Sequence, residues 1–473
     1  MKRKILVILV TAMLLLLTAC SVNGQNGNGS NEDGQGESAQ SSPIMKVGED
    51  VSKESQVSEG LTLLCDESSS FSNHFGTENG FYYFTESDTI TDNLAGMHLM
   101  YVDYATKKEV YLCSDSGCQH DSETCSSVFA QGEFGIDSLP FVWGNYLYVL
   151  NRDYDDDGSI TINLMEGGVS PEVEASAVTL WQMNLDGSER QKIYSFPDNA
   201  TAEKLVFGEG DYLWFVTKQL ETQDDQGESY TTSTDRVLAK YSILNHEIVD
   251  TISLDFGDGI YQSVIGGCDH TFVLHGVAYP EGMSEADMMK LSDEECKELY
   301  RNSNTVYSTV DVNSKDKKEI YRMDNEALRS TCAVKGGYLF ASDCAGGGIM
   351  KIDLSTEEQT KFADLKQNYI YFALEDTLCC CDPGATDDKT LYFVDMKTGE
   401  VHHSTLTNQS LGWPLDVLAD TSSHALVVYD YDATSHGDGS YTINQYKYAL
   451  ISKDDLYNSQ ANYEPIVMEG DGR

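Results

Sequence analysis

Gly80-Phe-Tyr-Tyr-Phe84 is the first of several similar segments, in which a glycine precedes any residue, a tyrosine, a large apolar residue and an aromatic. The other clear copies are Gly144-Asn-Tyr-Leu-Tyr148, Gly210-Asp-Tyr-Leu-Trp214 and Gly336-Gly-Tyr-Leu-Phe340. Weaker versions lie at residues 271–275, 377–382 and 425–429. Aromatic and apolar residues after a glycine are typical of a strand that follows a tight turn. We therefore expect one such strand at each of these places.

A second strand and a turn follow these segments at a regular distance. Examples are Tyr307-Ser-Thr-Val-Asp311, Met350-Lys-Ile-Asp-Leu354 and Tyr392-Phe-Val-Asp-Met396, whose aspartates are 42 residues apart. A third strand comes after the turn, as in Glu319-Ile-Tyr-Arg322. Short antiparallel strands with a period of about 40–45 residues are typical of propeller blades. Residues 61–473 are therefore predicted to form an all-β, seven-bladed β-propeller, with six or eight blades as alternatives because the last two units are degenerate.

The repeated strands resemble those of seven-bladed β-propellers of the quinoprotein, YVTN and TolB-like kind, over roughly residues 61–470. This resemblance implies a propeller body but no particular activity, because propellers carry many functions. Residues 60–65 are predicted to form an extra strand that closes the ring against the final blade.

The N-terminus has the features of an export signal. Met1-Lys-Arg-Lys4 is basic, and residues 5–17 form an apolar run that is too short to span a bilayer. The following Leu17-Thr-Ala-Cys20 resembles a bacterial lipoprotein lipobox, so residues 1–19 are predicted to be a signal peptide. The resemblance implies that Cys20 becomes the first mature residue, carries a lipid and anchors the chain on the extracytoplasmic face of the cell membrane. An ordinary secreted protein is the alternative.

Residues 20–60 are rich in Ser, Gly, Asn and Gln and poor in large apolar residues, so they are predicted to be a disordered tether. The chain has 31 basic and 77 acidic residues, a net charge of −46. Such a charge argues against nucleic-acid partners and against adsorption to anionic lipids. It suits an exported surface protein.

The first four blades are predicted to be enlarged between their second and third strands. The insertions lie at residues 152–177, 220–236 and 280–304. The last one carries two capping-box pairs, Ser284 with Asp287 and Ser292 with Glu295, and therefore predicts a small helical lid. A partner-binding helix is the alternative. Inserted hairpins on one face of a propeller are where ligand recognition is expected.

An acidic stretch in the first of these insertions has the pattern of a calcium loop. Asp153, Asp155 and Asp157 occupy alternate positions before Gly158, but Leu164 stands where a calcium loop has its bidentate glutamate. Calcium binding and a solvated acidic hairpin both remain open.

A second group of candidate ligands is Cys113, Cys118, His120 and Cys125. Three thiols and an imidazole within 13 residues are the ligand set of a tetrahedral zinc site. A loop disulfide and buried free thiols are the alternatives. As far as the resemblance goes, a similar cluster recurs in uncharacterised propeller-like lipoproteins of clostridial bacteria. Of the two metals, the sequence favours calcium over zinc and requires neither.

The other cysteines are treated separately, because 11 remain once Cys20 is lipidated, which is an odd number. Cys332, Cys344 and Cys379-Cys-Cys381 fall in apolar stretches and are predicted to be buried thiols.

Motifs of common catalytic sites, such as HExxH, GxSxG and the P-loop, do not occur in the sequence. We therefore expect a ligand-binding or protein-interaction module more than an enzyme, with an unknown protein or glycan as its partner. Tyr154, Tyr230 and Tyr279 are the predicted ligand-binding aromatics of the inserted hairpins. The alternatives are an extracellular enzyme that acts on glycans, peptides or cell-wall fragments, and a purely structural scaffold.

Overall fold

The structure is a computed structural model of the chain. It describes residues 58–65, 74–85, 88–91, 94–131, 134, 138–152, 178–197, 200–225, 228–257, 260, 262–280, 291–325, 331–343, 348–365, 369–381, 390–436 and 441–468. Among these residues, no helix is long and apolar enough to span a membrane.

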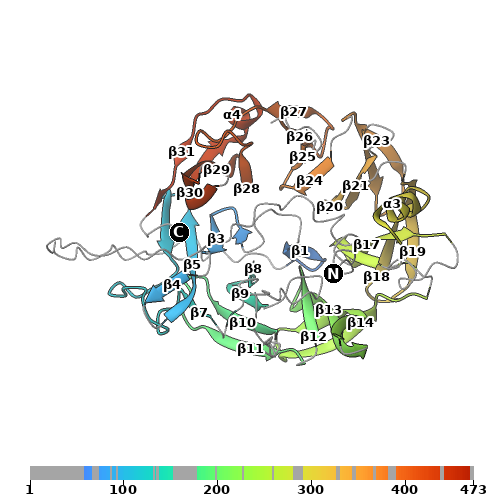
Figure 1. The fold of residues 1–473 in the computed structure, drawn as a ribbon, viewed down its shortest axis with the longest axis horizontal. Helices are drawn as coiled ribbons and strands as arrows, with labels where there is room; N and C mark the ends of the chain where they lie inside the picture. The colour runs from blue at the N-terminus through green and yellow to red at the C-terminus, as the bar shows by residue number, and fades with distance from the viewer. Residues whose placement is uncertain are drawn as a thin grey trace.

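Seven antiparallel sheets form a ring, as the sequence predicts (Figure 1). Blade 1 consists of β2 (His74–Gly76), β3 (Gly80–Phe84), β5 (Leu94–Asp103) and β6 (Lys108–Tyr111). Blade 2 consists of β8 (Leu139–Trp143), β9 (Tyr146–Asn151), β10 (Thr179–Asn184) and β11 (Gln191–Ser195). Blade 3 consists of β12 (Ala200–Glu209), β13 (Tyr212–Asp225), β14 (Glu228–Ser242) and β15 (Glu247–Ser253). The prediction of an all-β propeller with seven blades is confirmed.

The remaining blades follow in chain order. Blade 4 consists of β16 (Gln262–Cys268), β17 (Thr271–Ala278), β18 (Asn304–Asp311) and β19 (Lys317–Asp324), and blade 5 of β20 (Cys332–Lys335), β21 (Tyr338–Asp343), β22 (Gly348–Asp353) and β23 (Gln359–Ala363). Blade 6 consists of β24 (Tyr369–Ala373), β25 (Thr377–Cys381), β26 (Leu391–Asp395) and β27 (Val401–Ser404). Blade 7 consists of β28 (Asp416–Asp420), β29 (His424–Ser435), β30 (Tyr441–Ser452) and β31 (Glu464–Pro465). The first strands β2, β8, β16, β20, β24 and β28 contact at least one first strand of a neighbouring blade, so they line the centre of the ring. At blade 3 this place is taken by β1 (Thr62–Cys65), which contacts β8 and β16.

The core lies between the blades, where the faces of adjacent sheets meet. The repeated segment is the second strand of each blade. In the four clear copies its last two side chains, a large apolar residue and an aromatic, are buried, whereas Tyr146 of the motif is exposed. Between blades 3 and 4, for example, the Phe272 ring packs edge-on against Phe207 and Trp214, with centroids 5.1 and 5.2 Å away. Each such side chain contributes about 1.5–3 kcal/mol by leaving water. Repetition of the motif therefore repeats the same inter-blade contact around the ring.

The aspartate at the end of the third strand has a structural role in the turn. In blade 5 the Asp353 carboxylate accepts hydrogen bonds from the backbone amides of Ser355 and Thr356, both at 2.9 Å. Glu357 follows with a φ of 61°, which completes the tight turn. Asp311 and Asp395 accept the corresponding pairs of amides in blades 4 and 6. The 42-residue period thus marks a repeated turn.

The predicted closure of the ring is wrong. β1 (Thr62–Cys65) pairs antiparallel with β12 of blade 3, inside the ring, and does not reach the final blade (Figure 1). β1 therefore covers the inner edge of β12, and Leu61 and Leu64 are buried in the clusters around blade 3. The ring closes through β32 (Val467–Met468), which pairs in parallel with β6 of blade 1. The pairings of β1 with β12 and of β32 with β6 are short and occur once each, so the sequence carries no periodic signal for them.

The enlarged connections of blades 1 to 4 lie between the second and third strands, as predicted. In blade 1 the connection holds β4 (Asp88–Thr91), and in blade 3 it is the tip of the long β13–β14 hairpin. In blade 4 it holds α3 (Asp293–Arg301), where the side chain of Ser292 and that of Glu295 form the expected capping box. Blade 7 has an equally long β29–β30 hairpin, followed by α4 (Lys453–Tyr457), which we did not predict.

The connections between second and third strands share one face of the ring, which we call the loop face, because the strands of every blade alternate in direction. The turns between first and second strands share the opposite face, the turn face. The N-terminal segment joins the ring at the turn face, where the Gly210 amide donates to the Ser58 carbonyl and the Leu61 amide to the Asp269 carbonyl, at 2.8 and 2.6 Å. β1 then runs toward the loop face.

Candidate functional site

The Cys/His cluster lies in an excursion of blade 1. The chain leaves the outer strand β6, traverses residues 112–127 and re-joins the sheet as β7 (Val128–Ala130), which also pairs with β5. Turns fold the excursion back on itself: the Cys118 amide donates to the Asp115 carbonyl at 3.1 Å, and the Cys125 amide to the Ser122 carbonyl at 2.9 Å. His120 has a φ of 58°, so the backbone turns sharply at a ligand.

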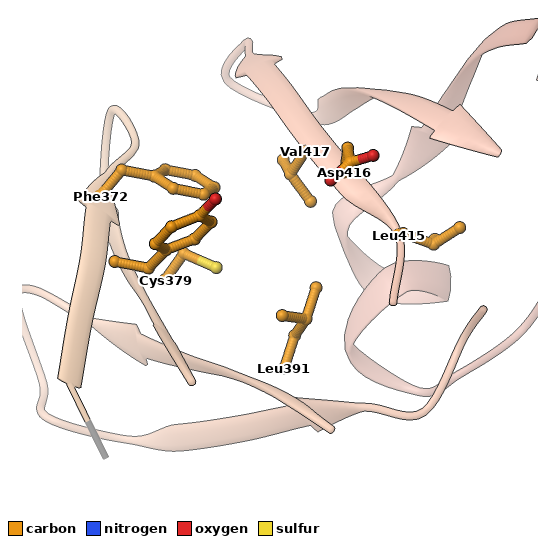
Figure 2. Close-up of a pocket in the computed structure, with 7 residues that line it drawn as sticks. Phe372, Cys379, Leu391, Leu415, Asp416 and Val417 are labelled. Carbon is orange, nitrogen blue, oxygen red and sulfur yellow. The ribbon is translucent and has the colours of Figure 1, made fainter. Parts of the chain in front are cut away.

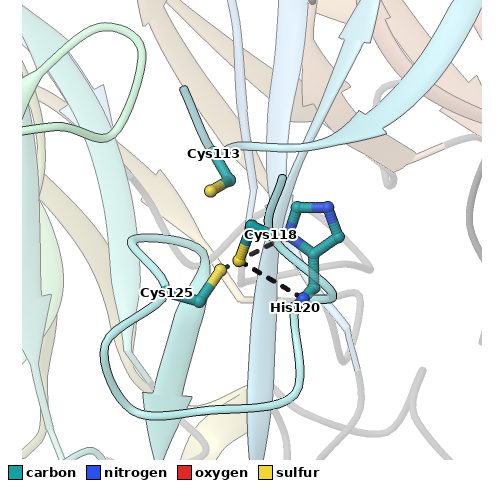
Figure 3. Close-up of side chains that lie close together, drawn as sticks. All are labelled: Cys113, Cys118, His120 and Cys125. Carbon is teal, nitrogen blue, oxygen red and sulfur yellow. Dashed lines mark hydrogen bonds between the residues drawn. The ribbon is translucent and has the colours of Figure 1, made fainter. Parts of the chain in front are cut away.

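The four side chains converge on one point (Figure 3). Their ligand atoms, the sulfurs of Cys113, Cys118 and Cys125 and one ring nitrogen of His120, lie within 4.8 Å of one another. His120 Nδ1 is 3.4 Å from Cys125 Sγ, and the His120 amide donates to Cys118 Sγ at 3.3 Å. In a tetrahedral zinc site, metal–ligand bonds of about 2.0–2.3 Å place the ligand atoms roughly 3.5–3.8 Å apart. Of the two candidate metal sites, the structure describes only this one.

Neighbouring residues orient the ligands. His98 of β5 donates from Nε2 to the His120 carbonyl at 2.8 Å, and the Tyr111 ring stacks on the His120 ring with centroids 4.4 Å apart. The Ser127 hydroxyl lies 3.2 Å from Cys125 Sγ. Such contacts around the ligands hold them in position before a metal arrives. We did not predict these three residues, since none stands at ligand spacing.

Burial sets the charge of the cluster. Cys125 is only 3% exposed, and desolvation raises the pKa of its thiol to about 12, against the opposing hydrogen bond from Ser127. Burial also lowers the pKa of His120, helped by His98 and opposed by Asp115 and Asp121. The imidazole is therefore neutral at pH 7, which is the form that binds metals. A cation is what stabilises the cysteines as thiolates in such surroundings.

Several predicted residues lie outside the described part of the chain. These are the lipidation residue Cys20, the calcium candidates Asp153, Asp155 and Asp157, the aromatic Tyr154 and the thiol of Cys344. Nothing in the structure tests them.

The other two predicted aromatics are on the loop face. Tyr230 is on β14, where its backbone pairs with Gln223 near the hairpin tip. Tyr279 follows β17, and it is half-buried near Tyr300 and Cys296 of α3, where desolvation raises its pKa. Tyr279 therefore lies beside the inserted helix. The two tyrosines are on different blades.

None of the remaining cysteines that the structure describes forms a disulfide. Cys379 and Cys380 are buried between blades, as predicted, whereas Cys332 and Cys381 are only partly buried. The Cys332 thiol is nevertheless desolvated, which raises its pKa to about 12. Burial raises the pKa of the Cys332, Cys379 and Cys380 thiols and so keeps them protonated.

A small cavity lies between blades 6 and 7 (Figure 2). Its lining is mostly apolar: Tyr371, Phe372, Cys379, Leu391, Leu415, Asp416 and Val417. The Tyr431 hydroxyl donates to the Asp416 carboxylate, and burial raises the pKa of that carboxyl. The space holds on the order of one water molecule. It is too small for an organic substrate.

Comparisons with known proteins add little. No protein-family model matches the sequence, and no curated protein matches it. Among solved structures, the chain is similar to TolB from Acinetobacter baumannii, with 11% identity and a TM-score of 0.29, over 81% of this chain and 77% of that one. It is also similar to an oligogalacturonate lyase from Vibrio parahaemolyticus, with 10% identity and a TM-score of 0.38, over 82% and 84%. Likeness this low carries no argument about activity, and the class of protein, a seven-bladed β-propeller, rests on the strand pairing of the chain itself.

Proposed function

We propose that the protein is a membrane-anchored, extracytoplasmic lipoprotein whose propeller binds a protein or glycan through its loop face. The observation that carries the proposal is the placement of the enlarged connections. The β13–β14 hairpin, α3 and the β29–β30 hairpin all extend from the loop face, whereas the N-terminal segment joins the ring at the turn face. Connections on a rigid scaffold are the usual place for binding residues.

The proposed anchor and tether fit this orientation. A lipid on Cys20 would hold the chain at the membrane, and a flexible coil of residues 20–60 would separate the ring from it by roughly 35 Å. Because the chain joins the ring at the turn face, the tether attaches on the side opposite to the hairpins. The loop face is then free to meet a partner outside the cell.

The anchor is tested by expressing the full chain in a bacterium supplied with an alkyne-labelled fatty acid. We expect labelled protein in the membrane fraction, and loss of both label and membrane association in Cys20→Ala. Thr18→Ala is the matched control, since it alters the same segment and keeps the cysteine. Label that persists in Cys20→Ala contradicts the anchor.

The binding role is tested with purified residues 21–473 on a glycan array and in affinity capture from the culture medium. A captured partner is then purified and its binding measured directly. Replacing residues 220–233 by Asn-Gly, which shortens the β13–β14 hairpin, is expected to weaken binding. Leu244→Ser is the matched control, because Leu244 is 73% exposed in the turn between β14 and β15. Equal binding by both variants and by the wild-type chain contradicts a role for the loop face.

A further inference from the structure

We propose that Cys113, Cys118, His120 and Cys125 bind one zinc ion, which holds the excursion of residues 112–127 against blade 1. This metal site is separate from the binding role proposed for the loop face. Its evidence is the path of the chain, the set of ligand atoms and the contacts around them.

The path of the chain shows that the excursion is a closed loop. The Leu112 amide donates to the Leu99 carbonyl at 2.9 Å, and the Leu99 amide donates to the Ser127 carbonyl at 2.8 Å. The excursion therefore starts and ends at the same residue of β5. The amide and the carbonyl of Leu99 point to the same edge of β5, so β6 and β7 pair with that edge one after the other. The intervening residues form an Ω-loop, and the pairing along β5 continues from β6 to β7 without a contribution from these residues.

The two ends of this loop are well held. The Ser126 hydroxyl donates to the Leu112 carbonyl at 3.1 Å. Arg190 of blade 2 donates to the carbonyls of Ser126 and Val128, at 3.3 and 2.7 Å, and its guanidinium lies over the Phe129 ring. The middle of the loop has no strand or helix, and the Cys/His cluster brings together Cys113 from its start, Cys118 and His120 from its middle and Cys125 from near its end. A metal would replace the missing apolar core of the loop.

The ligand set selects zinc over calcium or magnesium. Thiolates and an imidazole are soft or intermediate ligands, whereas calcium and magnesium take oxygen ligands. Four protein ligands complete a tetrahedron and leave no open position, which is the arrangement of a structural site rather than a catalytic one. An imidazole within the cluster also favours a metal over a disulfide, because a disulfide uses two of the three thiols and has no role for His120.

The neighbours of the cluster support the same conclusion. His98 and Tyr111 belong to strands of the blade, and they position the His120 backbone and ring respectively. The Ser127 hydroxyl, at the last residue of the loop, lies against the Cys125 sulfur. The blade itself therefore orients the ligands, so binding needs little rearrangement. His98 acts as a positioning residue, since it contacts a ligand and not the ion.

The test uses residues 21–473 purified with a reductant and without chelator, and metal content measured by mass spectrometry. We expect about one zinc per chain. Cys118→Ser and His120→Ala are each expected to lower zinc affinity by at least tenfold. His98→Ala is expected to lower zinc affinity by a smaller factor than these two variants. Cys268→Ser is the matched control, because this free cysteine is the last residue of β16 in blade 4, and its replacement is expected to leave zinc binding unchanged.

Cobalt substitution gives a readout of the ligands themselves. Wild-type chain loaded with cobalt(II) is expected to show thiolate-to-cobalt charge transfer and the intense visible bands of a tetrahedral ion. His120→Ala keeps all three thiols, so it should retain charge transfer and shift the visible bands. Circular dichroism shows whether each variant is folded.

Three results would overturn the proposal. One is the absence of zinc and of cobalt bands in the folded, reduced chain. Another is equal zinc content in all variants, which would place the metal elsewhere. The last is a disulfide among Cys113, Cys118 and Cys125, found by peptide mass mapping, that forms in the presence of zinc.

Discussion

Blades 1 and 5 are built on the same strand motif and carry very different additions. Blade 5 is four strands joined by short connections, with only residues 344–347 between β21 and β22. Blade 1 has the same four strands, and it adds β4, β7, the Ω-loop and the closing strand β32. All four additions attach to β5 and β6, the strands farthest from the ring centre. The comparison teaches that a propeller blade gains new elements at its outer strands while it keeps its four-stranded sheet.

The first prediction tests whether the inner packing of the two blades is equivalent. Phe84 of blade 1 packs edge-on against Phe129, and Phe340 of blade 5 packs against Phe362. Both phenylalanines are buried. Phe84→Ala and Phe340→Ala are each expected to lower the free energy of unfolding by about 3–5 kcal/mol, measured by urea denaturation. Leu244→Ala, at an exposed position, should stay within about 0.5 kcal/mol of wild type. A much smaller loss for Phe84→Ala would show that the blade 1 additions replace part of its core.

The second prediction sharpens the difference between the two blades. Removing the proposed zinc is expected to destabilise blade 1 alone. A ligand present at a hundredfold excess over its Kd stabilises the folded state by about 2.7 kcal/mol, and chelation removes this amount. Hydrogen exchange should therefore rise in residues 112–130 after chelation and stay unchanged in residues 348–363 of blade 5. Equal changes in both segments would contradict a local role for the metal.

The third prediction concerns pH and blade 1. Glu109 on β6 is fully buried, accepts a hydrogen bond from the Tyr83 hydroxyl, and has no described partner for its second oxygen. Desolvation raises the pKa of this carboxyl. Because the pKa of Glu109 is higher in the folded state than in the unfolded state, its protonated carboxyl contributes fully to the free energy of unfolding below the unfolded-state pKa. This contribution is lost as the pH rises through the folded-state pKa. Glu109→Gln is therefore expected to stabilise the chain by about 1–2 kcal/mol at pH 8, with little effect at pH 4, in paired thermal melts. Destabilisation at both pH values would contradict the burial cost.

The fourth prediction gives blade 5 the opposite pH dependence, with the smallest effect. Hydrogen bonds from the Ser355 hydroxyl and the Thr356 amide lower the pKa of Asp353 to about 2. Its contribution is therefore present above the unfolded-state pKa and is lost as pH falls toward 2. Asp353→Asn is expected to lower the melting temperature slightly at pH 6, and the difference should shrink in acid. A constant difference across this range would mean that the turn does not depend on the carboxylate charge.

The sequence contains a strong signal for the fold wherever the signal is periodic or local. The tyrosine motif and the 42-residue spacing predict the blades, because each blade repeats the same burial and the same aspartate turn. The pair Ser292 and Glu295 predicts the start of α3, since a capping box involves residues three positions apart. The four candidate metal ligands are also close in sequence. Their spacing therefore draws attention to them without any knowledge of the fold.

Contacts between distant residues escaped prediction. Glu109 reads as a surface residue of a charged strand, and only the neighbouring Tyr83 and β32 make it buried. His98 and Tyr111 lie on separate strands, and they meet at His120 only because the Ω-loop folds back on β5.

The sequence by itself determined the propeller architecture, with seven blades as its first choice, the turn aspartates, the capped helix and the group of four candidate ligands. All depend on interactions over a few residues or on a repeat. The tertiary structure decided where β1 inserts, how β32 closes the ring, and which side chains surround the cluster. The physical reason is that these contacts join segments far apart in the chain through only two to four residues each, so the local sequence does not specify them. Each short strand pairs with a sheet edge that is still unpaired once the blades have packed.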